Sequence, residues 1–192
     1  MALVNRVNGF RPVGTLSGGS WSDKVRRMYH VAGSNLILNV GDIVGLSGTA
    51  DADGVPGVLI GTAGSLPCGV IVGIEPQLDN LKYSYMPAAT NGYVFVCVDP
   101  FVIMETQASE AIAAAEIGCN ADLVQTTAAA SSTTTSGQQL DGNTTTNTST
   151  LVFNILGLAQ RPDNTLDTTY NKVLVTFNVH QFKSVGTTAA TE

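Results

Sequence analysis

The sequence predicts a mainly β protein, a small β-barrel or β-sandwich with one short helix and an extended N-terminal arm. The first observation is an alternation near the C-terminus, where one face of an expected strand carries Val173, Val175, Phe177 and Val179. The opposite face carries Lys172, Leu174, Thr176, Asn178 and His180. A period of two residues is typical of a half-buried strand. The second observation is a series of short apolar runs separated by glycines, which is typical of small barrels and sandwiches.

The composition of residues 1–34 predicts an extended arm. Glycine, proline and basic residues are mixed there with scattered aromatic residues, and no helical or strand period is sustained. One short element is expected around residues 23–30. Trp21 is the only tryptophan of the chain, and we expect it to pack on a neighbouring molecule or back on the core.

The β-rich body is expected to span residues 35–183 and to begin with four short strands. Their apolar runs lie at residues 36–40, 42–46, 55–61 and 68–74. Residues 92–98 are apolar on both faces, which predicts a central strand that is covered on each side. Asp99-Pro100 ends this strand, and residues 101–105 are expected to form another.

Residues 106–118 predict the one helix of the chain. Ser109 provides an N-cap, and Gly118 supplies the left-handed position at the C-terminal end. The apolar stripe of this helix consists of Ala111, Ile112 and Ala115. A short, alanine-rich helix of this kind is expected to pack closely against a sheet.

Residues 126–150 form a Thr/Ser-rich excursion within the body, with Asp141 as their only charged residue. This composition offers little apolar surface to offset the entropy of ordering, which indicates a disordered linker. The β-branched threonines indicate instead a long hairpin loop whose limbs pair as strands on assembly. A turn signal at residues 140–143 favours the hairpin. Residues 184–192 are expected to be a flexible tail.

Three patches of the sequence carry a resemblance to a known family. The first is Val-Asn-Arg-Val-Asn-Gly-Phe-Arg-Pro-Val at residues 4–13, and the second comprises Asp99-Pro100, Glu105, Gln107 and residues 117–123. The third comprises Leu-Gly-Leu at 156–158, Arg-Pro-Asp-Asn at 161–164 and Asn-Val-His-Gln-Phe at 178–182. These patches resemble the small head decoration, or cement, proteins that tailed bacteriophages encode beside the major capsid protein.

The resemblance implies a virion structural protein that decorates and stabilises the outer surface of a phage capsid. It also implies a homotrimer at local three-fold positions, with the major capsid protein and further copies of this chain as partners. Such a protein is made in the host cytoplasm and ends up on the outer capsid surface of the virion.

The charge of the chain is sparse and unevenly placed. Charged residues make up only 12% of the chain, which fits a surface covered by partners and equally a β protein with a neutral surface. The net charge is −6, yet the first 30 residues carry +4 and the remaining 162 residues carry −10. An acidic body argues against nucleic acid as the main partner, because phosphate binding needs clustered cations.

A basic arm on an acidic body fits docking onto an acidic protein surface, and a segment that only solubilises the chain is the alternative. We expect charge to steer the arm and aromatic side chains to anchor it on the capsid or on neighbouring subunits. The expected contact residues are Arg6, Phe10, Arg11, Trp21, Lys24, Arg26 and Arg27.

The motifs predict no enzymatic centre, no metal site and no cofactor site. The two histidines lie 150 residues apart, and His180 is expected to form hydrogen bonds at the surface or in an interface. Asp51-Ala52-Asp53-Gly54 offers two carboxylates and a turn glycine. Position 62 is threonine where a calcium-binding loop has glutamate, so a plain turn is expected.

The cysteines and the apolar runs give two further expectations. Cys68, Cys97 and Cys119 are odd in number and widely spaced, so reduced thiols are expected. The N-terminus lacks the apolar stretch of a signal peptide, and no apolar run reaches the roughly 18 residues of a membrane span, so no membrane partner is expected.

The alternative function is a phage tail or surface β-sandwich module that recognises host glycan, which would need exposed aromatic residues beside carboxylates or amides.

Overall fold

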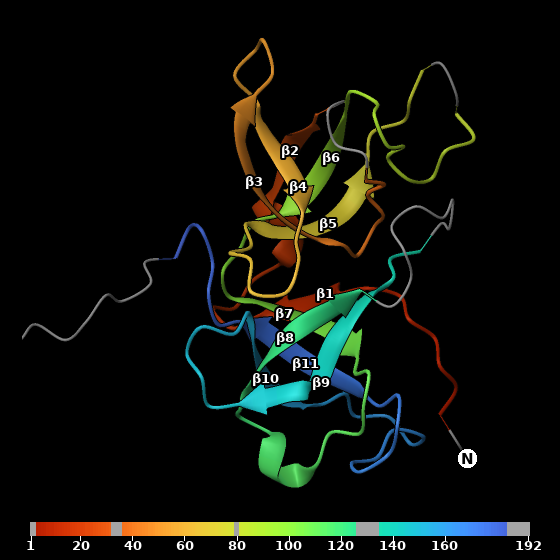
Figure 1. Ribbon diagram of the computed structural model, residues 1–192, viewed down its shortest axis with the longest axis vertical. Helices are drawn as coiled ribbons and strands as arrows, with labels where there is room; N and C mark the ends of the chain where they lie inside the picture. The colour runs from red at the N-terminus through yellow and green to blue at the C-terminus, as the bar shows by residue number, and fades with distance from the viewer. Residues whose placement is uncertain (1–2, 32–35, 79–80, 126–134, 184–192) are drawn as a thin grey trace, which may run out of the picture.

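The computed structural model describes residues 3–31, 36–78, 81–125 and 135–183. It confirms a mainly β protein and contains both a closed five-stranded barrel and an open six-stranded sheet. The barrel forms the upper half of the molecule in Figure 1 and the sheet forms the lower half.

The barrel has the strand order β2-β4-β3-β5-β6. Its strands are β2 (Val25–His30), β3 (Ile43–Ala50), β4 (Pro56–Ile60), β5 (Gly69–Ile74) and β6 (Gly92–Cys97). All neighbouring strands are antiparallel except the parallel pair β2 and β4. The buried interior consists of Met28, Leu38, Val44, Val58, Cys68, Ile71, Met86, Val94 and Val96.

The predicted central strand, β6, is covered fully on only one face. Val94 and Val96 are buried inside the barrel, whereas Tyr93 and Phe95 on the outer face are half-buried. The predicted strand at residues 36–40 is reduced to an isolated bridge between Leu38 and Met86.

The open sheet has the strand order β1-β7-β11-β10-β8-β9 and is antiparallel throughout. Its strands are β1 (Arg11–Thr15), β7 (Val102–Gln107), β8 (Asn120–Gln125), β9 (Gln138–Thr146), β10 (Phe153–Leu158) and β11 (Lys172–Phe177). The predicted alternation in β11 is confirmed, because Val173, Val175 and Phe177 are buried. These side chains bury apolar surface on one face of the sheet, which is the main driving force for its packing.

A shared core joins the barrel and the sheet. The Phe10 ring stacks on Phe153 with ring centroids 4.6 Å apart, and Phe153 stacks on Phe177 at 5.6 Å. Ile43 of the barrel packs in the same cluster. The side chain of Gln138 adds a polar link, since it accepts a hydrogen bond from the Ile43 N–H at 2.6 Å and donates to the Gly61 carbonyl at 2.9 Å.

The prediction of a helix over residues 106–118 is wrong. The strand β7 continues to Gln107, and the only helical part of this stretch is the short 3₁₀ turn η2 (Ala114–Glu116). Ser109 does not cap a helix, because its hydroxyl accepts a hydrogen bond from the Gly142 N–H and its own N–H donates to the Leu140 carbonyl. These long-range bonds to β9 override the weak helical preference of the alanines. Gly118 does adopt the expected left-handed conformation, at a φ of 90°.

The prediction that residues 1–34 form an extended arm apart from the body also differs from the structure. This stretch contains β1, the 3₁₀ turn η1 (Trp21–Lys24) and β2. All six residues of β2 pair with β6, so part of the expected arm is a wall of the barrel. Trp21 is half-buried and packs against the shared core, as one of the two expectations for it stated.

The excursion at residues 126–150 forms a strand in its second half. β9 pairs with β8, so residues 138–146 follow the hairpin alternative within a single chain. Residues 126–134 and the expected tail at 184–192 lie outside the described residues. In the described part of the chain, no helix is long and apolar enough to cross a membrane.

Candidate functional site: a basic cleft beside the sheet

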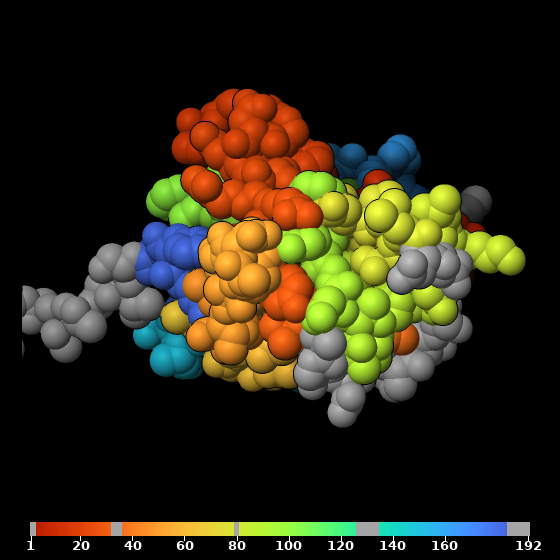
Figure 2. Space-filling model, turned by 90° about the horizontal axis from the view of Figure 1, so that it is seen from above, coloured from red at the N-terminus to blue at the C-terminus, as the bar shows by residue number. Residues whose placement is uncertain are grey.

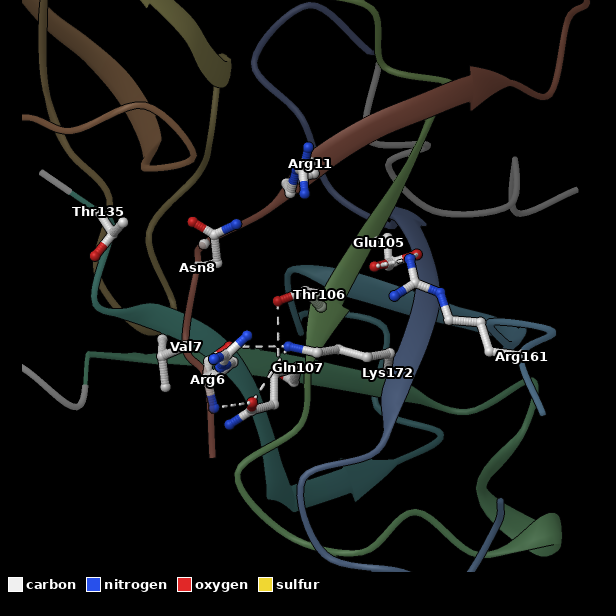
Figure 3. Close-up of a pocket in the computed structure, with 11 residues that line it drawn as sticks. Arg6, Val7, Asn8, Arg11, Glu105, Thr106, Gln107, Thr135, Arg161 and Lys172 are labelled. Atoms are coloured by element: carbon white, nitrogen blue, oxygen red, sulfur yellow. Dashed lines mark hydrogen bonds and ion pairs between the residues drawn. The ribbon is translucent and has the colours of Figure 1, made fainter. Parts of the chain in front are cut away.

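A cleft of about 420 Å³ lies between the chain segment that leads into β1 and the strands β7 and β11 (Figure 3). We call it the basic cleft. It is lined by Arg6, Val7, Asn8, Gly9, Arg11, Glu105, Thr106, Gln107, Thr135, Arg161 and Lys172.

The cleft exists because the segment just before β1 does not run alongside β7. The ladder between β1 and β7 ends at the pair Arg11 and Glu105. The preceding residue, Phe10, donates its N–H to the Gly41 carbonyl at 2.9 Å and buries its ring in the shared core. Gly9 makes this departure possible, because its φ is 66° and an added Cβ would lie 2.5 Å from the Gly41 oxygen.

Gln107 is the polar centre of the cleft floor. Its Nε2 donates to Asn5 Oδ1 at 2.8 Å and to Gln139 Oε1 at 3.1 Å. Its Oε1 accepts from the Arg6 N–H at 2.9 Å and from Lys172 Nζ at 3.2 Å. All four hydrogen-bonding positions of this buried amide are therefore used, and they fasten the N-terminal segment to the sheet.

Positive charge dominates the basic cleft. It contains four cationic side chains, those of Arg6, Arg11, Arg161 and Lys172, and one carboxylate, that of Glu105. These are four of the nine Lys and Arg residues in the chain, so a net charge of +3 lies in the cleft and −9 remains for the rest. The Arg161 guanidinium pairs with Glu105, with Nη2 2.5 Å from the nearer carboxylate oxygen.

Lys172 is a partly buried cation of the cleft that holds the N-terminal segment. Its Nζ donates to the Arg6 carbonyl at 2.9 Å as well as to Gln107. Burial lowers the pKa of Lys172, and although Glu105 opposes this shift, the positive charges of Arg161 and Arg11 add to it. In the described residues no ion pair engages the side chains of Arg6 or Arg11.

A second cavity of about 310 Å³ adjoins the basic cleft. The two cavities share Arg6, Arg161 and Lys172, and the second one is also lined by Leu3, Val4, Asp163 and Asn164. Val4 is 70% exposed there. Together the cavities form a trough that changes from cationic at Arg11 to partly apolar at Leu3 and Val4.

The structure divides the seven expected contact residues among different places. Arg6 and Arg11 line the basic cleft. Lys24 in η1 and Arg26 in β2 are exposed. They follow the connection between β1 and η1, and this part of the chain stands out as a red-orange ridge in Figure 2. Phe10 is fully buried in the core of its own chain, so as the chain is folded it cannot anchor a partner.

Arg27 is engaged within its own chain on the outer face of the barrel. Its Nε lies 2.7 Å from Glu75 Oε2, and its guanidinium lies 3.3 Å from the centre of the Tyr93 ring. The Tyr93 hydroxyl donates to Asp51 Oδ2 at 2.7 Å, and the neighbouring Tyr29 hydroxyl donates to Asn91 Oδ1 at 2.6 Å. Aromatic rings thus lie beside a carboxylate and an amide, but Arg27 covers one face of the Tyr93 ring.

Sequence reasoning missed half of the basic cleft. It singled out Arg6 and Arg11, whereas Lys172 and Arg161 come from the C-terminal hairpin, 150 or more residues away. The signal for Lys172 was its position on the polar face of the alternating strand. Gln107 and Arg161 belong to the patches that resemble cement proteins, but no local signal assigns them to a cleft. The pairing of β7 with β11 places Gln107 beside Lys172, and Arg161 comes from the connection between β10 and β11.

His180 was expected to form hydrogen bonds at the surface or in an interface, and it is fully buried within its own chain. Its ring lies between those of Phe177 and Phe182, at centroid distances of 4.9 and 5.6 Å. Its Nδ1 accepts a hydrogen bond from the Phe182 N–H at 3.1 Å. Burial lowers the pKa of His180 to about 4, so the imidazole is neutral at pH 7.

The cysteines and Asp51 have the following local environments. Cys68, Cys97 and Cys119 are all free thiols. Asp51 closes a turn by accepting hydrogen bonds from the N–H groups of Asp53 and Val55. No group of three or more metal-ligating side chains occurs in the residues that the structure describes.

Comparison with family models, with curated proteins and with solved structures finds no match for this chain.

Proposed function

We propose that this chain is a virion structural protein that decorates and stabilises the outer surface of a phage capsid. Its partners in this proposal are the major capsid protein and two further copies of itself. The observation that carries the proposal is the basic cleft, which gathers four cations on an otherwise acidic, charge-poor protein. The sequence resemblance to cement proteins supplies the kind of surface on which it docks.

The charge distribution supports an acidic protein surface as the target. A concave cationic site attracts an acidic surface from a distance, and the attraction is strongest when both sites exclude water. The −9 carried by the rest of the chain repels an extended polyanion such as DNA. A folded protein with a local acidic patch meets the cleft without meeting the rest of that negative charge.

The sheet edges support self-association. β1 and β9 are the two edge strands of the open sheet, and Ala108 and Ser109 of the same chain partly cover the edge of β9, so the edge of β1 is the one that a partner can cover. Near β1 the large apolar side chains of Val13, Leu16 and Phe101 are each between 43% and 53% exposed. Contact with further copies in a trimer covers such residues.

The test is sedimentation with empty shells assembled from the major capsid protein of the same phage. We expect the purified chain to pellet with the shells at low salt, to saturate at a fixed ratio and to raise the temperature at which the shells come apart. Failure to pellet with shells under these conditions overturns the proposal. Sedimentation equilibrium tests the trimer separately, and a monomer at all concentrations overturns that part.

The alternative of glycan recognition has one observation in its favour, the pair Tyr29 and Tyr93 beside Asn91 and Asp51. Sugar rings bind by stacking on exposed aromatic faces. Arg27 occupies one face of Tyr93, so we favour decoration. A glycan array that gives a specific signal, lost in Tyr29→Ala, would reverse this preference.

A further inference from the structure

We propose that the basic cleft binds an extended acidic peptide segment of a partner protein, whose carboxylates pair with the cations that line the cleft. This inference deepens the proposed function, on which it rests only for the identity of the partner. It adds the form of the ligand, a peptide strand with carboxylates on one face.

The floor of the cleft is the end of β7. β7 pairs with β11 as far as the pair Gln107 and Lys172, but its ladder with β1 ends at Glu105. Thr106 and Gln107 are buried there, and the Gln107 side chain is bonded to Asn5 and to the Arg6 N–H. The floor is therefore closed, and a ligand meets the charged side chains that line the cleft.

The cations of the cleft outnumber its carboxylates. Glu105 forms an ion pair with Arg161 and also acts on Lys172 through its charge, while no ion pair engages Arg6 or Arg11 in the described residues. The like charges crowd one another, and a bound carboxylate relieves that repulsion while it gains charge-assisted hydrogen bonds. The existing pair of Arg161 with Glu105 demonstrates the same chemistry inside the cleft.

The shape of the trough favours a peptide over a small anion. The two cavities have volumes of about 420 and 310 Å³ and share Arg6, Arg161 and Lys172 in their linings. An inorganic anion fills only a small part of that space. Successive residues of a strand point to opposite sides, so carboxylates at alternate positions of one peptide face the cations. Leu3 and Val4 provide apolar contact at the far end.

The experiment measures binding of a fluorescent eight-residue peptide of alternating glutamate and valine by anisotropy at low salt. The test variant is the double substitution Arg6→Gln and Arg11→Gln, because the side chains of these residues form no ion pair in the described structure. The matched control is Lys24→Gln with Arg26→Gln, which removes the same charge from exposed positions outside the cleft. The peptide with glutamine in place of glutamate, inorganic phosphate and a single-stranded DNA oligonucleotide are the comparison ligands.

We expect the dissociation constants of the glutamate peptide for the unaltered chain and for the control variant to lie within twofold of each other. We expect at least tenfold weaker binding to the cleft variant, and at least tenfold weaker binding of the glutamine peptide to the unaltered chain. Equal binding to all three proteins, or no binding at all, overturns the proposal. Tighter binding of DNA, or phosphate that competes at the same concentration as the peptide, also overturns it.

The outcome is separable from that of the proposed function. Shells that bind the chain while the peptide does not would leave decoration standing and remove the peptide cleft. A peptide that binds while shells do not would leave the cleft standing and remove the capsid as its partner.

Discussion

The ammonium of Lys172 holds the backbone of Arg6, which is 166 residues earlier in the chain, through a hydrogen bond of 2.9 Å to its carbonyl oxygen. The same ammonium donates to Gln107 Oε1, and that oxygen also accepts the Arg6 N–H. Both backbone groups of Arg6 are thus bound by side chains of two adjacent strands. The segment that leads into β1 is fixed on the sheet, and the basic cleft has its shape because of this fixation.

Replacement of Lys172 by methionine should release this segment. Lys172→Met keeps the apolar stem but leaves the Arg6 carbonyl without its donor, so we expect a loss of about 1–3 kcal/mol in the free energy of unfolding. Urea denaturation measures the loss, and hydrogen exchange at residues 3–8 should become faster. Lys24→Met, at an exposed position, is the control and should change neither quantity. Unchanged exchange at residues 3–8 would show that other contacts hold the segment.

Replacement of Phe10 by alanine should act on stability. The ring is fully buried and stacked on Phe153, so Phe10→Ala should lower the free energy of unfolding by about 3–5 kcal/mol. Val13→Ala is the control, because Val13 is 53% exposed, and it should cost no more than about 0.5 kcal/mol. A cost below about 1 kcal/mol for Phe10→Ala would place the ring outside the core.

His180 should make the protein less stable in acid. Its pKa is about 4 in the fold against 6.5 for the free side chain, so on acidification through this window the unfolded state takes up a proton that the folded state does not. The stability contributed by the neutral imidazole is fully present above pH 6.5 and declines by about 3 kcal/mol toward pH 4.

The variant His180→Gln keeps an acceptor for the Phe182 N–H and removes the titration. We expect the difference in free energy of unfolding between wild type and variant to shrink as the pH falls from 7 to 4. Chemical denaturation at four or more pH values measures this difference. A difference that is constant with pH would mean that His180 titrates normally.

Asp42 should contribute a dependence of the opposite sign. Burial raises its pKa to about 6 from 3.8, an effect that hydrogen bonds from Ser136 and from the Asn39 N–H reduce. The folded state therefore favours the protonated carboxyl, so its contribution is fully present below pH 3.8 and is lost by about 3 kcal/mol as the pH rises through 6.

The variant Asp42→Asn isolates this contribution. Relative to wild type, we expect it to gain stability as the pH rises from 4 to 6, because it carries no charge to bury. His180 and Asp42 change the free energy of unfolding in opposite directions over nearly the same pH range. A plot of the free energy of unfolding against pH should therefore be flatter for the wild type than for either variant. A wild-type plot steeper than both would show that the two contributions do not oppose each other.

The sequence by itself determined the local β character of the chain. The alternation that ends in Val175 and Phe177 identified β11 and its buried face, because successive side chains of a strand point to opposite faces and the apolar ones here share one face. The glycine-separated apolar runs identified β3, β4 and β5 for a similar reason. These features depend on neighbours along the chain, so a single sequence contains them.

Only the tertiary structure decided what those strands build and what the polar residues do. Residues 106–118 have helical composition, yet hydrogen bonds to β9 hold Ser109 outside a helix. His180 continues the polar face of a strand, yet it lies buried between two aromatic rings. The basic cleft joins Arg6 to Lys172 across most of the chain. Contacts at such separations are set by which strands pair and which rings share a core, and no local pattern encodes that choice.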